Sequence, residues 1–159
     1  MTEQTDAPSR VRIAEPCDFD QILFLAEEMH TENGLFSMSH TKVREMVMTH
    51  FERTGGLIGV IGEPGALEGI IGLRICQAAW YTDEVVLEDF MTFVLPEFRR
   101  SNNAKDLIDF AKKMSEEIGI PLLTGVVSNN RTEAKLGLYK RKFGAPAGAF
   151  FLANVNPSR

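Results

Sequence analysis

The stretch that decides the fold is VLPEFRRSNNAKDL, residues 94–107, which joins an apolar strand to a long amphipathic helix. The strand, EVVLEDFMTFVL (84–95), is rich in branched and aromatic residues, a composition typical of β-structure. After the turn, apolar residues recur at helical spacing as far as Ile118, and Gly119 ends the helix. The segment therefore predicts a strand, a tight turn and a helix in direct succession.

Such a turn predicts a local anion site. The first N–H groups of a helix have no partner within the helix, and the helix dipole adds positive potential at that end. Arg99 and Arg100 stand next to these groups, and arginine binds phosphate well. The residues alone leave a second interpretation open, a well-capped helix whose arginines are simply solvated.

Working outward, the remaining segments alternate between strand and helix patterns and predict an α/β domain. Glu63-Pro64-Gly65 is typical of a tight hairpin turn between two apolar strands. The glycines of GGLIGVIG (55–62) lie inside a strand pattern, so they favour close packing over a nucleotide-binding loop. The predicted order is βααβββαβαβ. The strands are expected at 11–15, 57–62, 67–80, 84–95, 122–127 and 148–155, and the helices at 18–33, 41–53, 104–118 and 131–142.

Composition bounds the class of protein. The chain has 159 residues, with 17 basic and 22 acidic side chains and a formal net charge of −5. This length and balance predict one domain (10–159) after a flexible tail (1–9), and they exclude a general binder of nucleic acid. Two cysteines are too few for a disulfide framework, and no segment has the length and apolar character of a membrane span. We expect a cytoplasmic protein without a metal site, since the three histidines have no metal-ligand spacing.

The 94–107 segment resembles motif A of the GNAT acetyltransferase superfamily, V-x-P-x-x-R-x-x-G-x-G/A-x-x-L. The predicted element order is also similar to that fold, which implies a mixed central sheet with helices on both faces. One position departs from the motif: Asn102 stands where the family has its first glycine, and its side chain occupies space near the expected phosphate. The matching residues are Val94, Pro96, Arg99, Ala104 and Leu107.

The resemblance implies acetyl-CoA as co-substrate and assigns residues to it. The end of the strand would pair through its main chain with the pantetheine arm, and the turn would hold the pyrophosphate. Asn129 or Asn130, after the fifth strand, matches an asparagine that contacts the cofactor. The residues expected to bind acetyl-CoA are Thr92, Phe93, Val94, Arg99, Arg100, Ser101, Asn102, Asn103, Ala104, Lys105 and Asn130.

Two catalytic residues are expected on the same basis. A tyrosine in the helix after the fifth strand would protonate the departing thiolate, and Tyr139 holds that place, although the glycine that follows it is shifted to Gly144. A carboxylate on the long strand would accept the proton of the attacking amine. Strand alternation places Glu88 with Phe90, Thr92 and Val94, and places Asp89 with Leu87, Met91 and Phe93; we favour Glu88 as base, with Glu84 as the alternative.

The function implied is an N-acyltransferase that moves an acetyl group from acetyl-CoA to a primary amine by direct attack in a ternary complex. The acceptor would be a small molecule or a peptide, bound near residues 32–40, 81–84 and 145–148. A homodimer through the last strand is compatible with this class. The alternative, favoured by Asn102 and the shifted Tyr139, is a non-catalytic GNAT-like domain that binds a protein or a metabolite.

Overall fold

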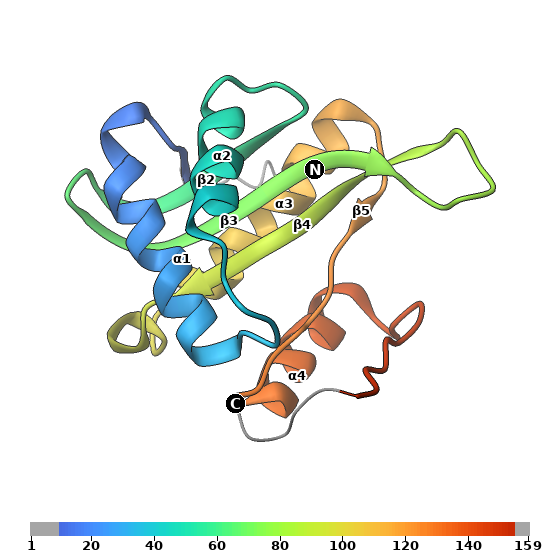
Figure 1. Ribbon diagram of the computed structural model, residues 1–159. Coiled ribbons are helices and arrows are strands. Elements are labelled where there is room, and N and C mark those ends of the chain that lie inside the picture. Colours follow the sequence, from blue (N-terminus) through green and yellow to red (C-terminus); the bar gives the residue numbers. More distant parts are fainter. Residues whose placement is uncertain (1–9, 155–159) are drawn as a thin grey trace, which may run out of the picture.

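The computed structural model describes residues 10–154 and shows one five-stranded sheet, ordered β1-β2-β3-β4-β5, with helices on both faces (Figure 1). The predicted tail at 1–9 lies outside these residues. The strands are β1 Arg12–Ile13, β2 Gly56–Glu63, β3 Ala66–Gln77, β4 Val85–Val94 and β5 Leu122–Leu123. The helices are α1 Phe19–Asn33, α2 His40–Phe51, α3 Asn103–Ile118 and α4 Thr132–Phe143, with 3₁₀ turns η1 Pro16–Asp18 and η2 Pro96–Phe98.

The sheet is mixed, as predicted. Strands β1 to β4 pair antiparallel in sequence order, and β5 pairs parallel with β4. The hairpin between β2 and β3 turns at Gly65, whose positive φ of 89° suits glycine. The parallel β4–β5 pair needs a crossover connection, and α3 supplies it.

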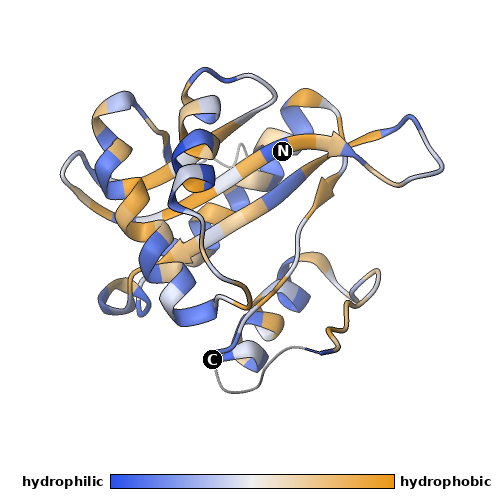
Figure 2. Cartoon of the chain, viewed as in Figure 1, coloured by the Kyte–Doolittle hydropathy of each residue, from blue (hydrophilic) through white to orange (hydrophobic). Residues whose placement is uncertain are grey.

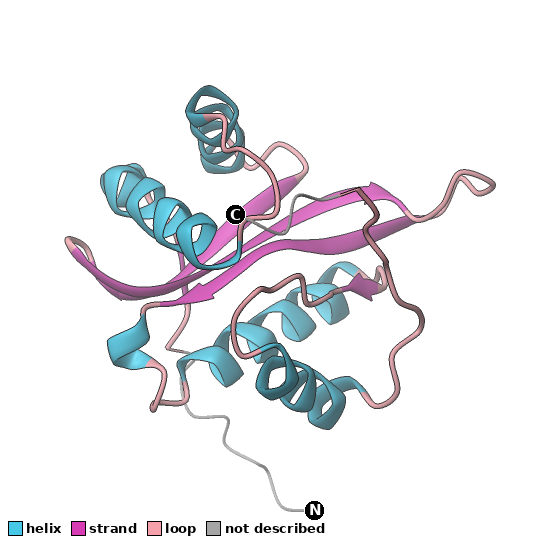
Figure 3. Ribbon diagram, turned by 60° about the horizontal axis from the view of Figure 1, so that its bottom comes forward, coloured by secondary structure: helices cyan, strands magenta, loops and turns pink. Residues whose placement is uncertain are grey.

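Two apolar layers hold the helices to the sheet. Helices α1 and α2 cover one face, and α3 covers the other, with α4 beyond it on the same side (Figure 3). In Figure 2 the sheet strands and the inner faces of the helices carry most of the apolar residues. The first layer is centred on Ile22, Leu25, Val47, Ile58 and Ile70, and the second on Ile61, Ile71, Leu73, Leu107 and Phe110.

Close packing accounts for a glycine of β2, as predicted. A Cβ on Gly59 would lie 2.7 Å from the ring of Phe110 on α3 and 3.0 Å from Val11. A larger side chain there would require these neighbouring side chains to shift. Gly56, Gly59 and Gly62 thus belong to strand β2 and not to a phosphate-binding loop, and Gly55 lies in the exposed turn before it.

A buried ion pair fastens the N-terminal end of the sheet to η1. Asp18 is fully buried, and its carboxylate accepts two hydrogen bonds from Arg12, at 2.7 and 2.8 Å, and one from the Glu15 N–H at 2.9 Å. Arg12 also donates to the carbonyl of Gly62. Hydrogen bonding to Arg12 is the main reason that the pKa of Asp18 is lowered.

A β-bulge in β4 changes which side chains share a face. Gly72 is opposite Met91 and Leu73 is opposite Asp89, so Phe90 is the extra residue between two paired positions. The Phe90 ring fills the space above Gly72, where a Cβ would lie 2.4 Å from the ring. The absence of a side chain at Gly72 is what gives this ring its place.

The simple alternation predicted for β4 is therefore wrong beyond the bulge. Leu87 packs in the layer under α3, whereas Met91 and Phe93 pack in the layer under α1 and α2. The same shift moves Val94 to the α3 side. It also moves Thr92 away from the face of Glu88 and onto the face of Asp89.

The C-terminal part departs most from the prediction. The expected strand at 122–127 pairs with β4 only at Leu122–Leu123, and residues 148–154 form no strand; residue 155 lies outside the described range. After β5 the chain leaves the sheet, and the following loop contacts the end of α1 through Ser128 and Asn129. Phe150 and Phe151 are consequently almost fully exposed.

Candidate active site

Four polar side chains converge where β4 and β5 separate. The Asp89 carboxyl accepts a hydrogen bond from Thr92 Oγ1 at 2.7 Å and another from Thr124 Oγ1 at 2.9 Å. Tyr139 Oη of α4 lies 3.3 Å from Asp89 Oδ2. These residues come from β4, from the segment after β5 and from α4, so the fold and not the sequence brings them together. We call them the Asp89 cluster.

The surroundings shift the titration of two members of the Asp89 cluster. Burial raises the pKa of Asp89, and the bonds from Thr92, Thr124 and Tyr139 only partly oppose this effect. Burial, followed by the nearby Asp89 charge, also raises the pKa of Tyr139. The cluster therefore favours a protonated phenol and a carboxyl group that takes up a proton more readily than an exposed one.

The second predicted catalytic residue lies on the other face of β4. Glu88 Oε2 accepts a hydrogen bond from Arg74 Nε at 2.5 Å and lies 3.7 Å from Cys76 Sγ. The structure therefore does not bring Glu88 and Tyr139 together. Its alternative, Glu84, is an exposed loop residue whose N–H donates to Thr82 Oγ1.

At the predicted anion site, at the start of α3, the backbone dihedral angles are ordinary. Asn102 is exposed and has φ −84°, so the glycine of the motif is not needed here for backbone conformation. Ser101 Oγ accepts from the Asn103 N–H at 3.1 Å, and the N–H groups of Ala104 and Lys105 belong to the first helical turn, which has no internal partners. Arg100 is exposed beside them.

Two side chains of this turn are engaged in contacts of their own. Asn103 is fully buried and donates to Glu68 Oε2 at 2.6 Å, while its Oδ1 has no partner among the described residues. The Lys105 ammonium pairs with Asp109 at 2.8 Å on the surface of α3. In these contacts, neither side chain points toward the expected anion site.

Arg99 folds back along the end of β4. Its Nε donates to the carbonyl of Val94 at 3.0 Å, and its guanidinium lies 5.4 Å from the centre of the Phe93 ring. The other end of the guanidinium donates to Glu32 Oε2 at 2.5 Å. The arginine expected to attract phosphate is therefore held by a carboxylate of α1. The Val94 carbonyl, at the strand end expected to pair with pantetheine, has a partner in Arg99.

Glu32 links α1 to both sides of the opening between β4 and β5. Besides Arg99, its carboxylate faces Lys135 of α4 at 3.4 Å. Burial raises the pKa of Glu32, but the bond and charge of Arg99, with help from Lys135, outweigh it and hold that pKa below its usual value. We call Glu32, Arg99 and Lys135 the Glu32 bridge.

The loop between β5 and α4 completes this link. Ser128 Oγ lies 2.8 Å from Asn33 Oδ1 and 2.7 Å from Lys135 Nζ, and Asn129 donates to the Gly34 carbonyl at 3.3 Å. Asn130 contributes its backbone, whose N–H donates to Ser128 Oγ at 3.2 Å, and its side chain is exposed. The loop is thus held to the end of α1 by Ser128 and Asn129, which directly precede Asn130.

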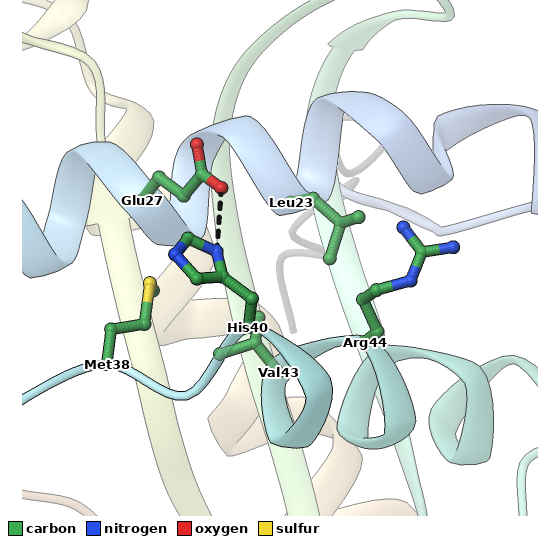
Figure 4. A pocket seen from close by; sticks show the side chains of 6 residues that line it. All are labelled: Leu23, Glu27, Met38, His40, Val43 and Arg44. Carbon is green, nitrogen blue, oxygen red and sulfur yellow. Dashed lines mark ion pairs between the residues drawn. The ribbon is translucent and has the colours of Figure 1, made fainter.

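Two surface hollows lie away from the Asp89 cluster. One, of about 140 Å³, separates α1 from α2, where Glu27 faces His40 at 3.2 Å and Arg44 stands at the rim (Figure 4). The other, of about 230 Å³, is apolar and is lined by Gln21, Phe24, Leu25, Ala66, Leu67, Leu95 and Phe98. The first adjoins the loop at 32–40 that was expected to help bind the acceptor.

Sequence reasoning missed two of these residues as site members. Asp89 was passed over because simple alternation placed it with Leu87 and Met91, and Glu32 was treated only as part of a loop. A glycine inside a strand pattern, as at Gly72, is the signal that could have suggested the bulge. Nothing in the local sequence of Glu32 marks it.

Two further features of residues 10–154 bear on the kind of site they can form. They contain no group of three or more His, Cys, Asp or Glu side chains placed to hold a metal ion. No helix in this range is long and apolar enough to cross a membrane.

Several solved structures are similar to this chain over most of its length, and acetyltransferases are among them. AAC(6')-Iy in complex with the bisubstrate analogue CoA-S-monomethyl-acetylneamine superposes with a TM-score of 0.69 at 16% identity, over 91% of this chain and 95% of that one. The ribosomal-protein-alanine N-acetyltransferase of Brucella melitensis biovar Abortus 2308 gives 0.65 at 14% identity, over 91% and 98%. A GCN5-related N-acetyltransferase from Ralstonia eutropha JMP134 gives 0.66 at 16% identity, over 92% and 98%.

These similarities establish the fold. The chain has the GCN5-related N-acetyltransferase (GNAT) fold, as the 94–107 segment and the element order predicted. At the level of sequence, no family model matches the chain, and no curated protein matches it.

Proposed function

We propose that this protein is an acetyl-CoA-dependent N-acetyltransferase that moves the acetyl group to a primary amine by direct attack in a ternary complex. The observation that carries the proposal is the Asp89 cluster, which places a protonated phenol where β4 and β5 separate in a GNAT fold. A neighbour of this fold was solved with a CoA-containing bisubstrate analogue. That neighbour supports CoA as the acyl carrier here.

The residues near the opening suit acetyl-CoA as a substrate. In the turn from Arg100 to Lys105, the N–H groups of Ala104 and Lys105 have no partner within the helix and would be available to the pyrophosphate. The main chain of Thr92, Phe93 and Val94 would bind the pantetheine arm once Arg99 releases the Val94 carbonyl. Asn130 would add a contact from its exposed side chain.

In the proposed reaction, the neutral amine attacks the thioester carbon, a C–N bond forms and the C–S bond breaks. Tyr139 donates its phenolic proton to the departing sulfur. Glu88 would receive the proton of the amine from the opposite face of β4, directly or through water, after release from Arg74. The acceptor would be a small molecule or peptide amine bound over the α1–α2 loop, and a homodimer stays a prediction.

Titration calorimetry with acetyl-CoA, followed by mass spectrometry of products across a panel of amines, tests the proposal. We expect binding and a mass gain of one acetyl group on at least one amine class. No heat at millimolar acetyl-CoA would refute it.

Two observations favour a second function, a GNAT-like domain that binds without catalysis. The Arg99 contact with the Val94 carbonyl occupies the expected pantetheine partner, and Asn102 replaces the motif glycine. Binding of acetyl-CoA with no transfer to any amine, and no hydrolysis, would support this function over the first.

A further inference from the structure

Asp89 is a carboxyl group surrounded by hydroxyls and not by cations. Thr92, Thr124 and Tyr139 all lie within hydrogen-bond distance of its two oxygens. Within residues 10–154, no lysine, arginine or histidine forms an ion pair with it. A partly buried carboxylate without a cation is costly, and this cost favours the uptake of a proton.

The charge of Asp89 decides where the Tyr139 proton points. An ionised carboxylate can only accept, so the phenol must direct its O–H toward Asp89 Oδ2, 3.3 Å away. A protonated Asp89 can instead donate its O–H to Tyr139 Oη. The phenolic proton is then free to turn toward another acceptor in the opening between β4 and β5.

We propose that Asp89 supplies Tyr139 with the proton that replaces the one given to the leaving thiolate, so that Asp89 and Tyr139 form a two-step relay. Asp89 acts only through Tyr139, and it is therefore a positioning residue and not a catalytic one. This inference rests on the proposed function and adds to it a group that the sequence pattern did not select.

Two proton transfers and one bond cleavage make up the relay. As the C–S bond breaks, the electron pair goes to sulfur and the Tyr139 Oη–H proton transfers to it. The Asp89 Oδ2–H proton moves to Tyr139 Oη, which leaves the phenol neutral and Asp89 as a carboxylate. Thr92 and Thr124 already donate to the two oxygens that then carry the charge, and Asp89 regains a proton from solvent after product leaves.

The direction of the Asp89 pKa shift is consistent with proton transfer from Asp89 to Tyr139. Burial raises the pKa of Asp89, while its three hydroxyl neighbours oppose that rise. Tyr139 from α4 is the titratable group that faces it; Thr92 of β4 and Thr124 after β5 carry no charge, and β3 places Leu73 opposite. Ionisation of Asp89 as the pH rises would remove the relay proton, so turnover should fall on the alkaline side.

The first test needs no turnover, because the chain has only two tyrosines. In a Tyr81→Phe background, the absorbance of tyrosinate follows Tyr139 alone. Asp89→Asn keeps the size of the side chain but removes the charge, so the Tyr139 midpoint should move to lower pH. Asp20→Asn, an exposed change of the same type on α1, should leave the midpoint unchanged.

The second test uses turnover with Tyr81 intact. Asp89→Asn should lower kcat on the order of 100-fold and abolish the alkaline fall in the pH profile. Thr124→Val, a smaller change that keeps the carboxyl, should move the alkaline fall to higher pH because a donor to the carboxylate is lost. A purely structural role for Asp89 would lower kcat without moving the profile.

The outcomes separate the two proposals. A lower Tyr139 midpoint together with the two profile changes supports the relay. An unchanged midpoint in Asp89→Asn, or an unshifted profile in Thr124→Val, overturns the relay and leaves the acetyltransferase proposal intact. A shifted midpoint in a protein that acetylates no amine overturns the proposed function, and the relay falls with it.

Discussion

Glu32→Gln should strengthen the binding of CoA. In the present structure the Glu32 carboxylate engages Arg99 at 2.5 Å and Lys135 at 3.4 Å, with side-chain exposures of 15%, 20% and 34% for Glu32, Arg99 and Lys135. The variant keeps the size of the side chain and removes its charge, which releases both cations for the phosphates of CoA. It also loosens the hold on Arg99 that keeps the Val94 carbonyl occupied.

The magnitude follows from the two contacts. A hydrogen bond to a charged group contributes about 1.5–3 kcal/mol, and the partial exposure of Lys135 reduces its share. We take about 2 kcal/mol as the cost of separating Glu32 from both cations before CoA can use them. That corresponds to a roughly 30-fold lower Kd in the variant.

Titration calorimetry of CoA against both proteins, at one salt concentration, measures this change. Glu116→Gln is the matched control, because it removes the same charge from an exposed position of α3. We expect the control to change Kd less than threefold, a margin set by screened surface charge. If the Kd of Glu32→Gln equals that of the control variant, or exceeds that of the parent, then Glu32 does not compete with CoA for Arg99 and Lys135.

Three further predictions concern stability and turnover. Asp18→Asn should lower the free energy of unfolding by about 3 kcal/mol, because Arg12 loses a fully buried partner. Because the pKa of Asp18 is lowered in the folded state, the parent keeps this stability above the ordinary aspartate pKa and loses it as the pH falls through the depressed value. Urea unfolding at two pH values measures both effects, and an equal Cm for variant and parent at pH 7 would contradict them. Gly72→Ala should lower the free energy of unfolding by about 1–3 kcal/mol, because the new Cβ would lie 2.4 Å from the Phe90 ring. Thermal unfolding measures this loss, and an unchanged Tm would show that the ring moves aside freely. Tyr139→Phe should lower kcat by about 100-fold or more while Kd for acetyl-CoA stays nearly constant; unchanged turnover in steady-state assays would remove the acid role.

The sequence predicted those parts of the fold that rest on local pattern. The expected helix at 18–33 corresponds to α1, and the helix up to Ile118 corresponds to α3, because each apolar stripe matches one buried face. The hairpin at Gly65 followed from turn chemistry. These features need only information that neighbouring residues carry.

The departures share a different physical origin, contact between distant residues. The bulge at Phe90 depends on Gly72 of another strand, and the hold on Arg99 depends on Glu32 of α1. The loop after the short strand β5 contacts a distant helix end, through Ser128 and Asn33. Strand alternation and motif spacing carry no information about these contacts. The sequence therefore predicted Tyr139 as a member of the candidate site but missed Asp89 and Glu32.

The two-residue length of β5 determines how the β4–β5 opening can move. Among the described residues, Leu122 and Leu123 of β5 pair with β4, and beyond them the opening is crossed by side-chain contacts, from Asp89 to Thr124 and Tyr139 and through Glu32 to Arg99 and Lys135. A backbone ladder opens cooperatively, but side-chain contacts can break and re-form one at a time. The opening can therefore widen by local breathing with the sheet intact, and amide hydrogens of 124–130 should exchange far faster than those of β3.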